Sequence, residues 1–142
     1  MGKYRFLENV AIADSAFEAE AESLEELFET CAEATFEVMA DTKTIEHKYK
    51  EDIELVGENI EELLFDWLAE LIYLKDSKSA LYSKFEVSIQ KKDGYRLNAA
   101  VWGEPADQKK HRVRVDVKAV TFHLLEVKKT DHKWTARVVL DT

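Results

Sequence analysis

The chain has 142 residues, of which 46% are hydrophobic and 11% aromatic, and its net charge is −9. This composition excludes a disordered chain, and the length predicts a single domain over residues 1–142. The acidic balance argues against broad contact with a nucleic-acid backbone, which needs clustered lysine and arginine side chains.

Local features of the sequence exclude a membrane-spanning protein and a secreted protein. Its apolar runs are too short to span a bilayer, and its N-terminus lacks the apolar core of a signal peptide. We therefore expect a cytoplasmic protein without a membrane contact. Cys31 is the single cysteine, so an internal disulfide is excluded. Residues 108–118 and 128–133 are locally basic, so any contact with RNA is expected to be weak or indirect.

The N-terminal residues alternate between apolar and polar side chains. This alternation predicts two strands, 3–7 and 17–22, joined as a hairpin. Asp14 would then lie at or near the bend of the hairpin. An aspartate in that position is usually a turn residue whose side chain bonds the backbone two residues on. This structural role is therefore one explanation of Asp14.

Helical spacing of apolar residues predicts two amphipathic helices, 24–40 and 60–74. Each follows a capping residue, Ser23 for the first and Asn59 for the second. Cys31 falls on the buried stripe of the first helix. Because no histidine lies near it in the sequence, we interpret it as a core residue and not as a nucleophile.

Period-two alternation predicts the remaining strands, which are 45–56, 85–90, 95–101, 112–127 and 134–140. A polar break is expected at 75–79, and Asp93-Gly94 indicates a hairpin with a type I′ turn. The order of elements predicts an α+β fold with a mostly antiparallel sheet of about six or seven strands. The last four strands would form a meander, and the two helices would pack on one face of the sheet.

The segment 112–127 changes phase in the middle. Its valines lie on one face up to Val117, and the apolar residues from Val120 onward take the other. A strand cannot change its buried face without a bulge, a bend or cover on both faces. One explanation is a functional site around Lys118 and His123. The other is a bent strand that crosses from one layer of the core to another.

The sequence lacks the motifs of the common enzyme classes, and its four histidines are scattered. A site with oxygen ligands remains, because Asp141 adjoins the terminal carboxylate of Thr142. If Asp14 lay close to them, three carboxylates would converge and would need a cation or a proton. Oxygen-only ligation is preferred by calcium, magnesium and manganese. The alternative is that these acids are simply solvated.

The chain resembles the archease family over nearly its whole length. The resemblance rests on FLENVAIADSAFEAEAESLEELFE (6–29), LLFDWLAELIYL (63–74), VWGEP (101–105), VKAVTFHLLEV (117–127) and a last strand that ends in aspartate. The motif VKAVTFH together with the terminal aspartate is the most specific part. Shorter blocks such as SLEELF are common in unrelated helices.

This resemblance implies an archease-like fold and a non-enzymatic role. Archeases are cofactors of the GTP-dependent, RtcB-type RNA-splicing ligase, whose guanylylation and multiple turnover they promote in tRNA splicing and RNA repair. The resemblance implies that Asp14, Asp141 and Thr142 bind a divalent metal. It also implies that Lys118 and His123 serve ligase activation. The expected metal is calcium, with magnesium and manganese as alternatives.

One motif departs from the family. Many archeases carry E-H-T-A-D at the first metal position, whereas residues 8–14 here read ENVAIAD. The stretch is two residues longer and lacks the histidine, although the acid, Asp14, is kept.

Two other functions stay open on the sequence alone. The protein could be a general chaperone or modulator of RNA-processing enzymes that recognises partners through its sheet and has no catalysis of its own. It could also be a hydrolase that uses the carboxylates and Lys118. The hydrolase is the weakest hypothesis, because the sequence shows no pairing of a nucleophile with a base. No catalytic residue is therefore expected, and the oligomeric state is left open.

Overall fold

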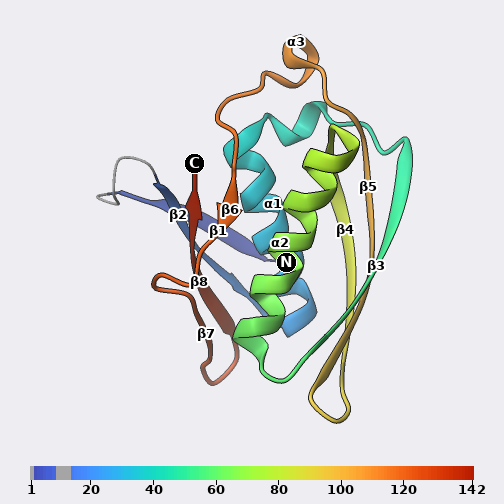
Figure 1. The fold of residues 1–142 in the computed structure, drawn as a ribbon. Coiled ribbons are helices and arrows are strands. Elements are labelled where there is room, and N and C mark those ends of the chain that lie inside the picture. The colour runs from blue at the N-terminus through green and yellow to red at the C-terminus, as the bar shows by residue number, and fades with distance from the viewer. Residues whose placement is uncertain (1, 9–13) are drawn as a thin grey trace.

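The computed structural model describes residues 2–8 and 14–142. Its strands form two antiparallel sheets with two long helices between them (Figure 1). The elements in chain order are β1 (Lys3–Leu7), β2 (Asp14–Ala21), α1 (Leu24–Met39), the 3-10 helix η1 (Thr42–Thr44), β3 (Tyr49–Gly57), α2 (Ile60–Lys78), β4 (Ala80–Lys91), β5 (Tyr95–Pro105), α3 (Gln108–His111), β6 (Ala119–Val120), β7 (Glu126–Lys129) and β8 (Trp134–Asp141).

The two sheets differ in size, with five strands in the first and three in the second. One sheet has the strand order β1-β2-β8-β6, with β7 also paired to β8, and the other has the order β3-β5-β4. The predicted α+β class with antiparallel pairing is confirmed. The expected meander of the last four strands is wrong, because β4 and β5 belong to one sheet and β6, β7 and β8 to the other.

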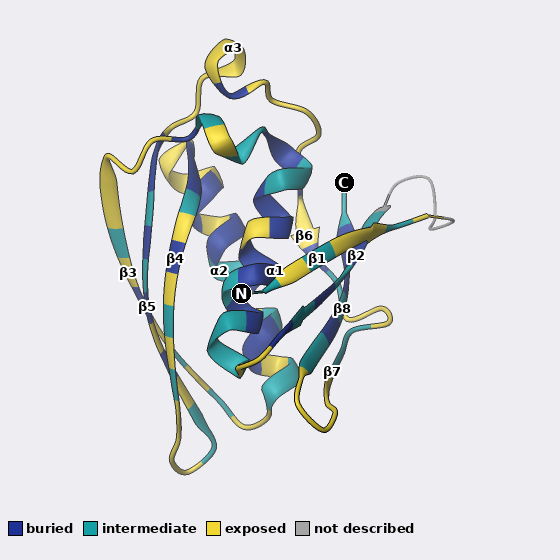
Figure 2. Ribbon diagram, turned by 180° about the vertical axis from the view of Figure 1, so that it is seen from behind, coloured by how far each residue is buried: buried dark blue, intermediate teal, exposed yellow. Residues whose placement is uncertain are grey.

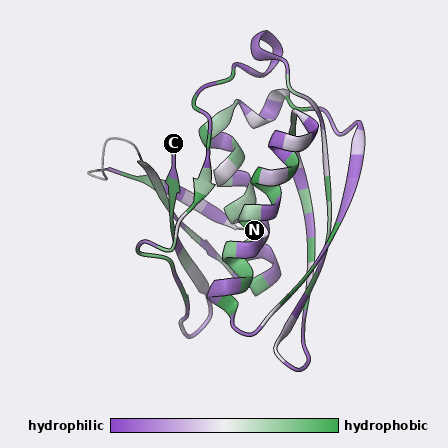
Figure 3. Ribbon diagram, in the orientation of Figure 1, coloured by the Kyte–Doolittle hydropathy of each residue, from purple (hydrophilic) through white to green (hydrophobic). Residues whose placement is uncertain are grey.

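The burial of helix α1 is the physical reason for two sheets, where the sequence predicted one. A helix that packs on one face of a sheet buries a single stripe. Helix α1 instead has buried residues around most of its circumference. They are Leu27, Phe28, Thr30, Cys31, Ala32, Ala34, Thr35, Phe36 and Met39. Figure 2 shows buried residues along both helices and on the strands beside them. The core therefore lies between the sheets, and Figure 3 shows hydrophobic residues following the same elements.

Aromatic side chains join α1, α2 and the second sheet in this core. Trp67 is fully buried, and its Nε1 donates a hydrogen bond to the carbonyl of Phe28 at 3.0 Å. Phe36 stacks on Phe85 with ring centroids 5.8 Å apart. Cys31 is also fully buried, which confirms its interpretation as a core residue.

The predicted helix starts are confirmed by their capping contacts. Ser23 Oγ accepts a hydrogen bond from the Glu26 amide at 3.2 Å, and Asn59 Oδ1 accepts one from the Glu62 amide at 2.9 Å. The expected polar break at 75–79 is wrong, because α2 continues to Lys78 and ends at Ser79. Basic residues in the last turn favour this extension through the helix dipole.

The hairpin between β4 and β5 is where the sequence predicts it. Asp93 and Gly94 both have positive φ angles, 51° and 95°. The register pairs Lys91 with Tyr95, so three residues connect the strands and not the two of the predicted type I′ turn. Farther along the hairpin, the pairing shifts between Tyr82 and Lys84. There the backbone of β4 comes so close to Gly103 that a Cβ on this glycine would lie 1.9 Å from the Leu81 carbonyl oxygen.

The long strand predicted over 112–127 is wrong. Residues 112–118 form no regular element, β6 has two residues, and a turn precedes β7. Residues 106–118, which we name the crossover, carry the chain from β5 over the helix ends to β6 (Figure 1). The alternative of a segment that passes between layers is therefore close to the observed path. Alternation alone could not distinguish an extended crossover from a strand, because it does not specify a pairing partner.

The phase change in this segment has a simple structural cause. Val113 and Val115 in the crossover are 42% and 47% exposed, whereas Val117 is fully buried where the chain enters the first sheet. The chain then reverses in a turn in which Leu124 has a φ of 57°.

Among the described residues, no helix is long and apolar enough to cross a membrane.

The close approach at Gly103 can be tested by adding a methyl group. Gly103→Ala should lower the free energy of unfolding by about 3 kcal/mol, because the new Cβ meets backbone that cannot move without disturbing the β4–β5 pairing. Gly57→Ala is the matched control, since its Cβ would meet the Leu63 side chain at an ordinary 3.4 Å. Urea denaturation measures both variants, and equal stability would contradict the predicted clash.

Candidate functional site

Three segments that are far apart in the sequence meet at the end of the first sheet. Strand β2 begins at Asp14 and β8 ends at Asp141, and the register pairs these two residues directly. From the other edge of β8, Ala119 pairs with Asp141, and the Lys118 amide donates a hydrogen bond to the Asp141 carbonyl at 2.8 Å. The backbone therefore gathers Asp14, Lys118 and Asp141 at the end of β8, and Figure 1 shows β2 and β6 beside β8 near the C-terminus.

Burial of β8 fixes the position of this strand end. Val138, Val139 and Leu140 are at most 1% exposed, so both faces of the strand are covered. Both edges are also paired, with β2 on one side and with β6 and β7 on the other. The Thr121 amide and hydroxyl both donate to the Val139 carbonyl, at 3.1 and 2.9 Å. The last residues of the chain are consequently held by a packed strand.

The predicted site residues differ in what the structure shows of them. Asp14 is placed by its backbone, and its side chain lies outside the described part of the chain, as do residues 9–13 of the altered motif. Asp141 and Thr142 are partly exposed, and the Lys118 side chain is exposed. His123 lies apart from the strand pairing, exposed in the turn between β6 and β7.

The donor set at this strand end suits a hard cation. The backbones of Asp14 and Asp141 lie directly opposite each other in the register. Carboxylate oxygens are the ligands that calcium, magnesium and manganese prefer. Among the described residues, no three side chains of histidine, cysteine, aspartate or glutamate form a group that could hold a metal. These residues do not include the side chain of Asp14.

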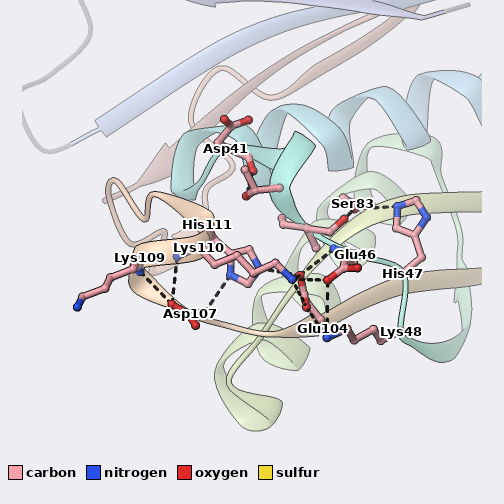
Figure 4. Close-up of polar contacts among 12 residues, drawn as sticks. Asp41, Glu46, His47, Lys48, Ser83, Glu104, Asp107, Lys109, Lys110 and His111 are labelled. Carbon is pink, nitrogen blue, oxygen red and sulfur yellow. Dashed lines mark hydrogen bonds and ion pairs between the residues drawn. The ribbon is translucent and has the colours of Figure 1, made fainter.

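A second polar cluster, not predicted from the sequence, lies where β5 leads into α3 (Figure 4). Glu104 and His111 are 3% and 0% exposed, and His111 Nε2 lies 2.8 Å from Glu104 Oε2. The Asp107 amide donates to His111 Nδ1 at 2.9 Å. Because Nδ1 accepts a hydrogen bond, the ring proton is on Nε2 and is donated to the Glu104 carboxylate.

The Glu104 carboxylate has further donors around it. It accepts from the Glu46 amide at 2.8 Å and from Lys110 Nζ at 3.0 Å. Burial opposes the charged form and raises the pKa of Glu104. The hydrogen bonds from Glu46, His111 and Lys110 outweigh this effect, and the pKa of Glu104 lies well below its usual range.

The Glu104–His111 pair fixes the start of the crossover. It ties α3 to the end of β5, and the His111 carbonyl accepts from the Asp41 amide at 2.9 Å. Sequence reasoning could not find the pair, because a glutamate at a strand end and a histidine in a short helix form no recognised motif. The block VWGEP marked the stretch without indicating what Glu104 does.

Comparisons with known proteins agree on one family. A model of the archease protein family matches residues 4–142. The protein archease of Methanothermobacter thermautotrophicus is 43% identical over 130 residues, which are 91% of this chain and 92% of that protein. The protein archease of Pyrococcus furiosus is 39% identical over 131 residues, with coverage of 91% and 92%.

Two solved structures share the fold of this chain. The solution structure of Methanobacterium thermoautotrophicum protein 1598 has a TM-score of 0.86 and 40% identity to this chain and covers 98% of both chains. The crystal structure of a Thermotoga maritima archease, described as a possible chaperone, has a TM-score of 0.66 at 24% identity. It covers 92% of this chain and 91% of that one, and this likeness shows the fold alone.

The buried carboxylate predicts a specific dependence on pH. Because the pKa of Glu104 is lower in the folded chain than its ordinary value of 4.5, ionised Glu104 stabilises the fold at neutral pH. That contribution is lost as the pH falls below the ordinary value. Glu104→Gln should therefore cost about 2 kcal/mol of unfolding free energy at pH 7, and the cost should shrink towards pH 3.

Urea denaturation across this pH range measures the difference between the wild type and the variant. Glu46→Gln removes the exposed carboxylate that also contacts Lys110 and is the matched control, for which little change is expected. A Glu104→Gln difference that stayed constant with pH would contradict the lowered pKa.

Proposed function

The chain belongs to the archease family, and from this premise we propose that it is a non-enzymatic cofactor of a GTP-dependent RNA-splicing ligase. It would promote guanylylation of the ligase and so allow multiple turnovers in tRNA splicing and RNA repair. The observation that carries the proposal is the meeting of Asp14, Asp141 and Lys118 at one strand end. The partner is a protein, which suits a chain of net charge −9, and the location would be the cytoplasm.

The carboxylates of this strand end would hold a divalent cation. Asp14 and Asp141 would each supply oxygen ligands, and the terminal carboxylate of Thr142 would supply more. Calcium is the first candidate, with magnesium and manganese as alternatives. When bound, the ion would neutralise the carboxylates and fix their orientation. The chain itself contributes the backbone register that pairs Asp14 with Asp141.

Lys118 would supply a mobile positive charge next to this group. Its amide is fixed on Asp141, whereas its side chain is exposed, so the ammonium can reach beyond the surface of the protein. Guanylylation transfers the guanylyl group of GTP and releases pyrophosphate, and the charge on the α-phosphate must be stabilised in the transition state. We propose that Lys118 assists there, within the ligase site, and that His123 contacts the ligase from the neighbouring turn.

Two described side chains that could act as nucleophiles, Cys31 and Ser83, are unsuited to catalysis. Burial raises the pKa of the Cys31 thiol, which disfavours the reactive thiolate. Ser83 Oγ lies 3.0 Å from His47 Nε2, but its hydroxyl also donates to the Ile45 carbonyl at 3.0 Å. His47 is therefore a hydrogen-bond donor to Ser83 and not the base that would activate it. These contacts favour a cofactor over a hydrolase.

A general chaperone or modulator of RNA-processing enzymes is the second candidate. The Thermotoga maritima archease is described as a possible chaperone. In this chain Phe122 and Leu124 are 63% and 52% exposed between β6 and β7, and exposed apolar groups are used for protein contacts. A general chaperone would suppress aggregation of unrelated proteins, whereas the ligase cofactor would act on its ligase alone.

The metal site can be tested by calorimetric titration with calcium, magnesium and manganese. The wild-type protein should bind one divalent ion, and Asp14→Asn or Asp141→Asn should abolish binding, because each variant removes a charged ligand. A C-terminal extension should weaken binding by displacing the carboxylate of Thr142. Asp131→Asn, in the turn at the other end of β8, is the matched control. Equal affinity in all of these proteins would contradict the site.

Activation of the ligase can be tested with Lys118→Met. Because the Lys118 side chain is exposed, the variant should keep the melting temperature of the wild type. It should nevertheless lose the stimulation of RNA joining over many turnovers, measured with the cognate ligase, GTP and divalent metal. Lys92→Met, in the exposed β4–β5 turn, should stimulate like the wild type. A Lys118→Met protein that still stimulates fully would remove Lys118 from the proposed site.

A further inference from the structure

Lys75, near the end of α2, is a buried lysine with unusual partners. The residue is 7% exposed. Its Nζ donates to Asp116 Oδ1 at 2.6 Å and to the Val117 carbonyl at 2.9 Å, and it lies 2.7 Å from Asp76 Oδ1. A buried ammonium is costly unless each of its three hydrogens has an acceptor. Lys75 meets this requirement, and two of its acceptors lie on the crossover.

The contact with Val117 acts on the peptide group that carries Lys118. The carbonyl of this group accepts the hydrogen bond from Lys75, and its N–H, which belongs to Lys118, donates to the Asp141 carbonyl at 2.8 Å. Both ends of one planar peptide group are thus held, one by α2 and the other by β8. The ammonium also polarises the carbonyl and so strengthens the N–H as a donor.

Other contacts of the crossover act farther from Lys118. The Arg114 guanidinium donates to the Glu37 carbonyl at 2.6 Å, and the Arg114 amide donates to the Met39 carbonyl at 2.7 Å. These bonds tie the middle of the crossover to α1. Lys75 is the residue that joins α2 to the peptide group preceding the Lys118 side chain. A buried charge often adds little stability compared with an apolar side chain of similar size, so orientation is the more specific effect of this contact.

We propose that Lys75 is a positioning residue for ligase activation. It fixes the peptide group between Val117 and Lys118 and thereby holds Lys118 against the C-terminal end of β8. The inference rests on the proposed function and extends it to a residue that does not itself reach the ligase. Lys75 acts through Lys118.

The test compares Lys75→Met with the wild type in the full-length protein. Methionine fills a similar apolar volume, and Asp116, whose side chain is 68% exposed, can be solvated after the ammonium is removed. Amide hydrogen exchange at Lys118, followed by NMR, should accelerate about tenfold, while the amides of β8 at Ala136 and Val138 keep their protection. Stimulation of RNA joining should fall about tenfold.

Two variants separate positioning from a general loss of stability. Lys78→Met removes an exposed lysine of the same helix end, which pairs with Glu51, and should leave both measurements unchanged. Lys75→Arg keeps a buried cation that can donate to the Val117 carbonyl and should recover most of the stimulation. If Lys75→Met does not fold, Lys75→Gln serves in its place, with faster Lys118 exchange and weaker stimulation expected.

The outcomes distinguish this inference from the function on which it rests. A wild-type protein that does not stimulate the ligase contradicts the proposed function. In that case, hydrogen exchange at the Lys118 amide still shows whether Lys75 fixes the peptide group between Val117 and Lys118. A wild-type protein that stimulates, together with a folded Lys75→Met or Lys75→Gln variant that stimulates equally, overturns the positioning role. Faster exchange that is uniform along β8 also overturns it, because the effect would then be global destabilisation.

Discussion

The pairing of β8 on both of its edges is the constraint on which the candidate site depends. The end of a chain usually frays, and carboxylates on a frayed end cannot be held at fixed distances. Here β2 pairs with one edge of β8 up to Asp141, and β6 pairs with the other. Val138 and Leu140 are fully buried in the hydrophobic core. The pairing and burial of β8 therefore hold the backbone at its end in a fixed position.

The crossover supplies the remaining part of the site and is fixed by buried or charged contacts. Glu104 and His111 hold its beginning, Arg114 binds α1 in its middle, and Lys75 holds its end. Such polar contacts are directional, and each therefore specifies a backbone position that apolar packing alone would leave less defined. An irregular segment can in this way present Lys118 beside the strand end as reliably as a strand would.

Much of the fold was predictable because it is encoded locally. The cap at Ser23, the cap at Asn59 and the hairpin at Asp93-Gly94 each depend on neighbours within a few residues, and all three are confirmed. The first hairpin was predictable for the same reason. Its register ends with Leu7 opposite Ala16, and β2 begins two residues earlier, at Asp14.

The errors arose where partners are distant in the sequence. Lys75 was assigned to a polar break, because two of its three acceptors lie about forty residues later. The valines of 112–117 were assigned to a strand, because alternation does not reveal whether a neighbouring strand is present. The candidate site is an intermediate case. The backbone of the structure brings Asp14, Asp141 and Lys118 together, whereas their roles in metal binding and ligase activation stay predictions.

The most direct test of the proposed function is transfer of label from radioactive GTP to protein. With the cognate ligase and divalent metal, the account predicts that this chain raises the rate at which the ligase becomes labelled and carries no label itself. In the absence of the ligase, it predicts no labelled protein. Covalent label on this chain alone, or a rate of ligase labelling that is unchanged by its presence, would contradict the account.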